Sequence, residues 1–296
     1  MSYTPAMLWP EPGSNILRWS RSGVVTGQED TWTTEVFTWN TPRHTVAAPA
    51  LARHVDGVYM AWVDDGDHIY TSKLGDGPTG DQDQTTWSSS IDTGFRTHQR
   101  PAIASYAGQL YLAWKDATEN TIHWAHGSAA GWEVEVATPW PTDYGPALGS
   151  SFFAGMFMAW RGRTPDSQLH WTRFNGTARW FDGPDNRYEG WSADGPALVG
   201  TFGHVHMAWR GDRDDKRLWW SKYDGGWAAQ QPLDGWSVTA PSLATEDGQT
   251  VSLVYTEQNP QDGHGQLYWS HTTPAGDWAA HQPVDGRRAY YSPATA

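Results

Sequence analysis

The sequence predicts an all-β protein, a single six-bladed β-propeller of four-stranded antiparallel blades that spans residues 1–296. Three observations carry this prediction. A proline motif recurs about once every 50 residues, aromatic residues recur at fixed places after it, and the last five residues match the one strand that the N-terminal repeat lacks. Repeats of this length are typical of propellers, in which each repeat forms one blade.

The proline motif marks the start of each repeat. It reads PAL, PAI or a close variant, and successive copies lie 52, 45, 50, 45 and 52 residues apart. After each of the first five copies, an apolar run ends in an aromatic residue, as in YMAW to Trp62 or SLVY to Tyr255. We expect the blade repeats to begin near Pro49, Pro101, Pro146, Pro196, Pro241 and Pro293.

A second aromatic series follows after a polar turn in each repeat. Its members are Trp124, Trp171, Trp220 and Trp269, with Thr71 as the exception. A third tryptophan series opens the outer strand. Both faces of a blade pack against neighbouring blades, and side chains alternate between the faces of a strand. We therefore interpret most of the 21 tryptophans as core residues that pack between blades.

The N-terminal repeat begins in the middle of a blade. Its segments MLW, ILRWS and TWTTEVF match the second, third and fourth strands of the other repeats. The missing first strand is SPATA, residues 292–296, and the interval from Pro293 around to Pro49 is again 52 residues. The sequence thus predicts that the C-terminal strand closes the N-terminal blade, which leaves no exposed sheet edge.

Composition excludes several classes of protein. Charged residues make up only 18%, no stretch is apolar enough to span a bilayer, and the net charge of −13 opposes a phosphate backbone. We expect no nucleic-acid partner and no membrane insertion. The chain has no cysteine, and MSYTPAMLWPEPG lacks the basic start and apolar run of a signal peptide. This predicts a cytoplasmic protein or one released by a signal-independent route.

Positions that differ between repeats are better candidates for function, because a core position should be filled in every blade. Three repeats place a cation directly after the second-strand aromatic: Lys115, Arg161 and Arg210. The other repeats have Pro10, Val63 and Thr256 there. The same three repeats carry an extra tryptophan in the connector to the next blade: Trp140, Trp191 and Trp236.

The joint occurrence of cation and aromatic suits a sugar pocket. An aromatic ring stacks on the C–H face of a pyranose, while Arg or Lys donates hydrogen bonds to hydroxyl oxygens. An equally simple reading is structural, with the cation packed over an indole to seal a blade junction. Several weak sites on one chain would raise avidity for a glycan-covered surface.

The pattern GPAL, MAWRG and LHWT or LWWSKYDGGW resembles the repeat of bacterial propeller lectins of the Photorhabdus fucose-binding type, over nearly the whole chain. That resemblance implies tandem blades with several shallow pockets for fucose or related sugars, glycoconjugate partners and possible homo-oligomers. Those lectins typically have seven blades, whereas six are counted here. The six-blade count is similar to that of the fungal fucose lectins.

Two other functions fit the same fold. Five residues after the inner-strand proline stand His54, Tyr106 and Glu246, which would form an acid–base site if they converged on the central channel of a propeller enzyme, such as a natural-product cyclase, an isomerase or a glycan-processing enzyme. A protein-interaction scaffold with an apolar rim is the third possibility. The acidic turns lack the spacing of known calcium loops, so we expect no metal and no cofactor.

Overall fold

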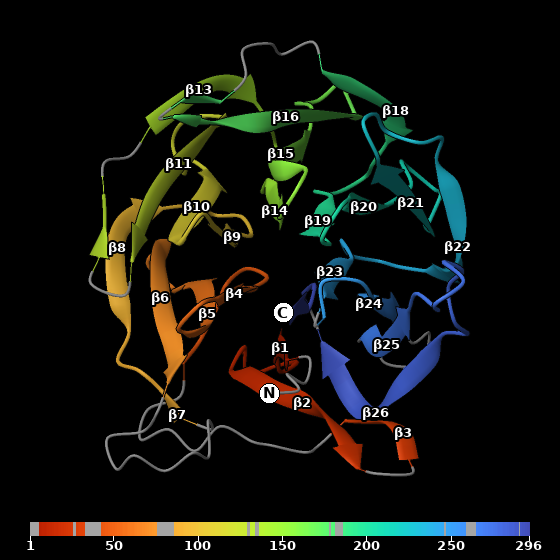
Figure 1. The fold of residues 1–296 in the computed structure, drawn as a ribbon. Coiled ribbons are helices and arrows are strands. Elements are labelled where there is room, and N and C mark those ends of the chain that lie inside the picture. Colours follow the sequence, from red (N-terminus) through yellow and green to blue (C-terminus); the bar gives the residue numbers. More distant parts are fainter. Residues whose placement is uncertain are drawn as a thin grey trace.

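The computed structural model forms six antiparallel sheets arranged in a ring around a central axis, a six-bladed β-propeller (Figure 1). It describes residues 6–25, 28–32, 43–75, 86–128, 131–133, 136–177, 179–180, 186–245, 247–258, 265–289 and 291–296. The predicted fold class is confirmed.

Each blade runs from an inner strand at the axis to an outer strand at the rim. In blades 2, 3 and 4 the outer strand is split into two segments that pair with the same third strand. Blade 1 contains β27 (Ala294–Thr295), β1 (Ala6–Pro10), β2 (Leu17–Val25) and β3 (Gln28–Trp32). Blade 2 contains β4 (Ala50–His54), β5 (Gly57–Val63), β6 (His68–Gly75), β7 (Thr86–Trp87) and β8 (Ile91–Arg96). Blade 3 contains β9 (Ala102–Tyr106), β10 (Gln109–Lys115), β11 (Thr121–Ser128), β12 (Gly131–Trp132) and β13 (Val136–Pro141).

The second half of the ring follows the same order. Blade 4 contains β14 (Ala147–Ser151), β15 (Gly155–Arg161), β16 (Gln168–Thr177), β17 (Arg179–Trp180) and β18 (Arg187–Trp191). Blade 5 contains β19 (Ala197–Gly200), β20 (Val205–Arg210), β21 (Arg217–Tyr223) and β22 (Gln231–Trp236). Blade 6 contains β23 (Ser242–Thr245), β24 (Val251–Gln258), β25 (Gly265–His271) and β26 (Gln282–Ala289).

The proline motif sets where each inner strand begins. All six inner strands (β4, β9, β14, β19, β23 and β27) start at the residue after a motif proline. Proline has no N–H for the sheet ladder and favours an extended conformation in the residue before it, so it fits the last connector position before a strand.

The ring closes through the C-terminal strand, as predicted. In blade 1, Met7 pairs with Thr295 and Leu8 pairs with Ala294, so β27 takes the inner position that β1 leaves open (Figure 1). Two side-chain contacts add to the closure: Thr295 Oγ1 lies 3.0 Å from Ser242 Oγ of blade 6, and Arg53 of blade 2 donates to the Ala296 carbonyl at 3.1 Å. The terminal strand therefore contacts both neighbouring blades.

The core lies between blades. One cluster joins Trp140 of blade 3 to Met158 and Trp160 of blade 4, and the next joins Phe157 of blade 4 to Trp209 of blade 5. The second-strand aromatics Trp9, Trp62, Trp114, Trp160, Trp209 and Tyr255 are all buried. This confirms that the first aromatic series packs the blade junctions.

Thr71 shows how an exception to the aromatic series is accommodated. Its hydroxyl, buried in blade 2, accepts a 3.2 Å hydrogen bond from the indole N–H of Trp132 in blade 3. A neighbouring blade thus supplies the ring that Thr71 lacks.

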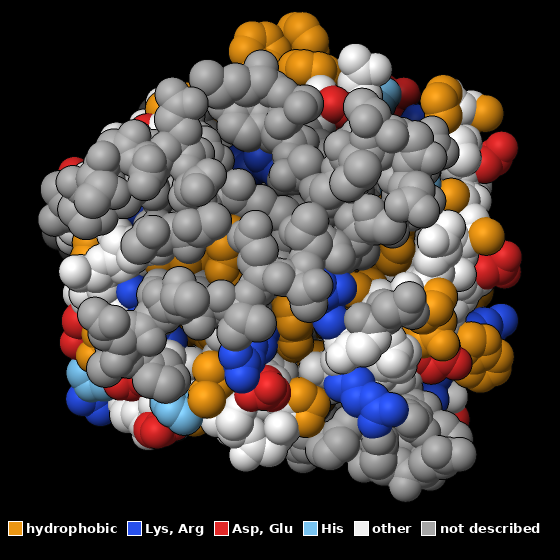
Figure 2. All heavy atoms as spheres, turned by 90° about the horizontal axis from the view of Figure 1, so that it is seen from below, with side chains coloured by type: hydrophobic (Ala, Val, Ile, Leu, Met, Phe, Trp, Pro, Cys, Tyr) orange, Lys and Arg blue, Asp and Glu red, His pale blue; other side chains and the backbone are white. Residues whose placement is uncertain are grey.

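The surface mixes side chains of every kind. On the side formed by β2, β7 and β26, basic, acidic and hydrophobic side chains are interspersed among the described atoms (Figure 2). Among the residues that the structure describes, no helix is long and apolar enough to cross a membrane. The large hydrophobic side chains that are exposed are Val55, Phe152, Phe153, Trp191, Phe202 and Trp236.

Deletion of residues 292–296 should open the ring. The change removes the β27 pairing with β1 and five residues that are all buried in the closed form. We expect the melting temperature to fall by about 10 °C or more, or the chain to oligomerise through the freed edge. Calorimetry and gel filtration measure both; a monomer that melts at the wild-type temperature would contradict ring closure as a source of stability.

His206 should make stability depend on pH. Its ring stacks on Trp220 with centroids 6.0 Å apart, and burial, with smaller contributions from His204 and Lys222, lowers its pKa from 6.5 to about 4. The folded protein thus holds His206 neutral, whereas the unfolded chain binds a proton near pH 6.5. The contribution of neutral His206 to the free energy of unfolding is therefore fully present above about pH 6.5. It is lost as the pH falls to about 4, and the loss is roughly 3 kcal/mol at most.

Urea unfolding at pH 7.5 and pH 5 tests this. In His206→Gln, the loss of stability between the two pH values should be smaller than in the wild type by about 2 kcal/mol. His44→Gln is the matched control, because the His44 side chain is exposed and its ring contacts the Ser14 backbone carbonyl rather than a carboxylate. An equal pH dependence in all three proteins would show that His206 titrates normally.

Candidate functional site

The residue six positions before each motif proline is equivalent in all six repeats, and in four of them its side chain covers the second-strand aromatic of the next blade. Arg43 lies over Trp62 at 4.8 Å, Phe95 stacks on Trp114 at 4.4 Å and Trp140 stacks on Trp160 at 4.9 Å; Arg287 covers Trp9 at 5.5 Å. Strand pairing places Gly190 and Gly235 at the same position in blades 4 and 5. Four large side chains and two glycines therefore occupy six equivalent places.

The two glycines leave room for other rings. A Cβ on Gly190 would lie 2.9 Å from the Tyr188 ring and 3.0 Å from Trp209. A Cβ on Gly235 would lie 2.9 Å from His281 Nδ1 and from the Tyr255 hydroxyl. Tyr188 and His281 accordingly pack where Phe95 and Trp140 pack in other junctions.

The three connector tryptophans do not share one environment. Trp140 is 4% exposed and belongs to the core between blades 3 and 4. Trp191 and Trp236 stand one residue later in the strand register, opposite Gln168 and Arg217, and are 51% and 59% exposed. Because side chains alternate along a strand, this shift of one residue turns Trp191 and Trp236 to the surface.

The three candidate cations also differ. The Arg161 side chain is 9% exposed; its Nε donates to the Ser192 carbonyl at 2.7 Å and its guanidinium lies over Tyr144 at 5.1 Å. Lys115 donates to the Asp116 carbonyl at 3.4 Å, and the Nε of Arg210 is buried without a hydrogen-bond partner among the described residues. Arg161 therefore connects blade 4 to the next connector, the structural role considered above.

A group of site residues was missed from the sequence: carboxylates paired with rings four residues further along the chain. Glu119 contacts the His123 ring at 3.3 Å, Asp166 contacts the His170 ring at 3.0 Å, and Asp215 accepts from the Trp219 indole N–H at 2.9 Å. These pairs occupy blades 3, 4 and 5, which also carry the three cations. The signal available in the sequence was an acid in the turn and a ring four residues later on the third strand.

Blade 5 carries the most complete set of such groups. Its outer cluster, defined here as Asp215, Arg217, Trp219 and Trp236, sits at the rim. Arg217 donates to both oxygens of Asp215, at 2.8 and 3.3 Å, and its guanidinium lies over the Trp219 ring at 4.8 Å. Trp236 is directly across the strand pair from Arg217. The cluster thus offers a carboxylate acceptor, a guanidinium donor and two aromatic faces.

Electrostatics keep this carboxylate ionised. Desolvation favours the neutral acid, but hydrogen bonds from Arg217 and Trp219 together outweigh it, and the pKa of Asp215 is lowered. The pKa of Arg217 is raised, because its guanidinium donates hydrogen bonds to the Asp215 carboxylate. The charged pair is half exposed, so both groups keep lone pairs and N–H groups for a ligand.

Blade 4 repeats the arrangement with different chemistry. Its outer cluster consists of Asp166, Gln168, His170 and Trp191, in which Gln168 replaces the guanidinium and His170 replaces the indole. Desolvation opposes ionisation of Asp166, yet hydrogen bonds from the Gln168 backbone and the His170 ring lower its pKa. The blade 3 equivalents, Thr121 and Pro141, provide no exposed tryptophan.

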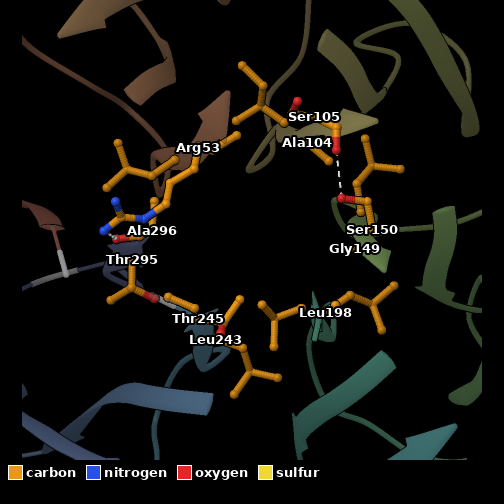
Figure 3. Close-up of a pocket in the computed structure, with 17 residues that line it drawn as sticks. Arg53, Ala104, Ser105, Gly149, Ser150, Leu198, Leu243, Thr245, Thr295 and Ala296 are labelled. Atoms are coloured by element: carbon orange, nitrogen blue, oxygen red, sulfur yellow. Dashed lines mark hydrogen bonds between the residues drawn. The ribbon is translucent and has the colours of Figure 1, made fainter. Parts of the chain in front are cut away.

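The channel candidates lie beside the axis without lining its cavity. Nδ1 of His54 is 2.7 Å from Ser105 Oγ, and Tyr106 meets Phe174 edge-on at 6.2 Å in the core of the blade 3–4 junction. A 140 Å³ axial cavity is instead lined by Arg53, Ser105, Ser150 and Thr245 (Figure 3). These residues stand four positions after a motif proline, whereas the channel candidates stand five positions after one. Glu246 lies outside the described residues.

Metal ligands do not gather in the part of the chain that the structure describes: no group of three His, Asp or Glu side chains is placed to hold an ion. The acidic turn of blade 5 is otherwise engaged, since Asp212 accepts from Ser167 at 2.8 Å and Asp215 from Arg217 and Trp219.

Comparison with known proteins identifies structural neighbours. No protein-family model matches the chain, and the search of curated proteins gave no match. The fucose-specific lectin from Aleuria aurantia has a TM-score of 0.67 at 10% identity, over 97% of this chain and 93% of the lectin. An Arthrobotrys oligospora AofleA variant with three arginines replaced by alanine gives 0.66 at 14%, over 100% and 90%. The BP39L lectin from Burkholderia pseudomallei gives 0.59 at 16%, over 95% and 84%. At these identities the likeness establishes the propeller fold.

Alanine substitution should separate Trp140 from Trp191. Trp140→Ala removes a buried ring stacked on Trp160, and we expect it to lower the free energy of unfolding by about 3–5 kcal/mol. Trp191→Ala removes an exposed ring and should change it by about 0.5 kcal/mol or less. Urea unfolding measures both; similar losses in the two variants would mean that Trp191 is as much a core residue as Trp140.

Proposed function

We propose that this protein is a carbohydrate-binding lectin for fucose and related sugars, with its principal sites at the outer clusters of blades 4 and 5. The observation that carries the proposal is the blade 5 cluster, in which an exposed indole stands directly across from a charged pair. Two structural neighbours titled as lectins, one of them as fucose-specific, support the sugar class.

The chemistry of the blade 5 cluster suits a pyranose. The exposed face of Trp236 provides a platform for the apolar C–H groups of a sugar, while Asp215 accepts hydrogen bonds from hydroxyl groups. Arg217 donates to hydroxyl or ring oxygens in a fixed fork geometry. Both charged groups are already held by each other, so little side-chain freedom is lost on binding.

Two sites on adjacent blades would act together. The blade 4 and blade 5 clusters occupy equivalent strand positions, so they present their ligands at the same edge of neighbouring blades. A glycan surface engaged at both sites is bound with higher avidity than either site provides alone. The different polar residues, Gln168 and Arg217, predict unequal affinities for one sugar.

The test is calorimetric titration with methyl α-L-fucoside after a glycan-array screen. We expect two sites per chain in the wild type and one in Trp236→Ala, with at least about a tenfold loss of affinity at the altered site. Asp215→Asn should weaken the same site and leave the blade 4 site unchanged.

Phe152→Ala is the matched control, because it removes an exposed aromatic side chain from the β14–β15 hairpin, at the opposite end of β15 from the turn that carries Asp166. Arg161→Ala tests whether Arg161 stabilises the fold or binds sugar. If its role is structural, the variant should have a lower melting temperature and an unchanged number of sugar sites. Unchanged stoichiometry and affinity in a Trp191→Ala, Trp236→Ala double variant would refute the proposal.

A further inference from the structure

The central shaft is divided by an apolar girdle. The third residue of each proline motif points to the axis, and five of these six residues are aliphatic: Leu51, Ile103, Leu148, Leu198 and Leu243, with Thr295 as the sixth. The cavity in Figure 3 lies at the girdle and extends to the hairpin end of the shaft. On the other side, the connectors enclose a second chamber of 250 Å³.

This connector chamber contains two opposite charges. Arg100 comes from the connector before blade 3 and Asp194 from the connector before blade 5. Arg100 lines both this chamber and the narrow passage toward the girdle, so it forms part of the chamber floor. Polar groups of Gln99, Thr239 and Ser292 also belong to the wall.

Neither charge is satisfied by the protein. Among the described residues, the Arg100 side chain donates one hydrogen bond, to the Pro241 carbonyl at 3.1 Å, out of five N–H groups. Asp194 accepts from the backbone N–H groups of Gly195 at 2.7 Å and Ala240 at 3.0 Å, which leaves lone pairs on both oxygens. No ion pair within 4.0 Å joins these two described side chains, and both line the chamber.

For both groups, the pKa is shifted toward the neutral form, because nearby partners do not fully offset the loss of solvation on burial. Burial lowers the pKa of Arg100 to about 10 although Asp194 opposes the shift. Burial likewise raises the pKa of Asp194 against its two backbone hydrogen bonds and against Arg100 and Arg210. An ion in such surroundings gains free energy from any partner that restores the solvation lost on burial.

Neither residue is part of the repeat pattern. The residue before the motif proline is small in every other repeat: Ala48, Gly145, Gly195, Ala240 and Ser292. The position of Asp194 is uncharged in the other five: Ala47, Gln99, Tyr144, Thr239 and Tyr291. Two charged residues with unused hydrogen-bonding capacity thus face one chamber, at positions where the other repeats have uncharged residues.

We propose that the connector chamber is a binding site for a small zwitterion of the α-amino-acid class, with its carboxylate on Arg100 and its ammonium group on Asp194. A zwitterion supplies both missing charges at once, whereas an anion or a cation would leave one of the two unpaired. The volume of 250 Å³ lies below the range of pockets for drug-sized ligands, which limits the ligand to a few heavy atoms.

Access to the chamber comes from the connector face. His98 lines the chamber and its side chain is 54% exposed, so the wall reaches solvent there. The chamber is lined by the connectors before the inner strands, whereas the outer clusters of blades 4 and 5 lie on or beside β16, β18, β21 and β22, farther from the axis (Figure 1). The site is therefore independent of the proposed sugar sites.

Titration of the full chain with glycine, L-alanine and L-serine, followed by saturation-transfer NMR and calorimetry, tests the proposal. At least one of these amino acids should bind, and acetate and methylammonium, each with one of the two charges, should bind at least about tenfold more weakly. Arg100→Met and Asp194→Asn should each weaken the amino acid by about tenfold or more. Gln99→Ala alters the same wall without removing a charge. It should reduce the affinity for the amino acid less than Arg100→Met or Asp194→Asn does.

The outcomes are separable. Absence of binding by all three amino acids, or equal binding of acetate or methylammonium, overturns the zwitterion site. Should the single variants fail to fold, the double variant Arg100→Met, Asp194→Asn keeps the chamber neutral and should be folded and unable to bind. Binding of methyl α-L-fucoside should be unchanged in all these variants, so failure of the sugar sites and failure of the chamber are distinguished.

Discussion

Ring closure is the constraint on which the rest of the structure depends. A blade alone exposes two apolar faces and an unpaired edge, and it becomes stable only when neighbours cover both faces and the last strand completes the first blade. The pairing of Met7 with Thr295 and of Leu8 with Ala294 supplies that completion. Six blades then surround a central shaft, and the inner strands form its wall. The six junctions between blades are equivalent in position, but different side chains pack in them.

Those differences locate the candidate sites. Where Phe95 or Trp140 covers the second-strand ring, the junction is filled by core packing. At Gly190 and Gly235 the cover is supplied by rings from other positions, and the following residue, Trp191 or Trp236, presents its indole to solvent. Polar groups that the fold does not need gather at these rims and in the connector chamber. Stability and binding are thus assigned to different residues of the same repeat.

The repeats made the fold predictable from sequence, because spacing fixes the blade count and the residue after each proline begins a strand. The sites were harder to predict. Trp140 was grouped with Trp191 and Trp236, although it stands six residues before its motif proline and they stand five before theirs, which places Trp140 on the opposite face of the outer strand. The sequence shows Asp215 only as one acid of an acidic turn, because its contact with Trp219 depends on how the turn folds back. Arg100 and Asp194 come from different connectors to one chamber, and residues brought together in this way leave no local pattern in the sequence.

The most direct measurement of the central claim is a crystal structure of the protein grown with methyl α-L-fucoside. The account predicts sugar density against Trp236 and the Asp215–Arg217 pair, and against Trp191 and Asp166 on the adjacent blade. Sugar bound instead at Arg161 and Arg210, or in the axial cavity lined by Arg53 and Ser105, would contradict it.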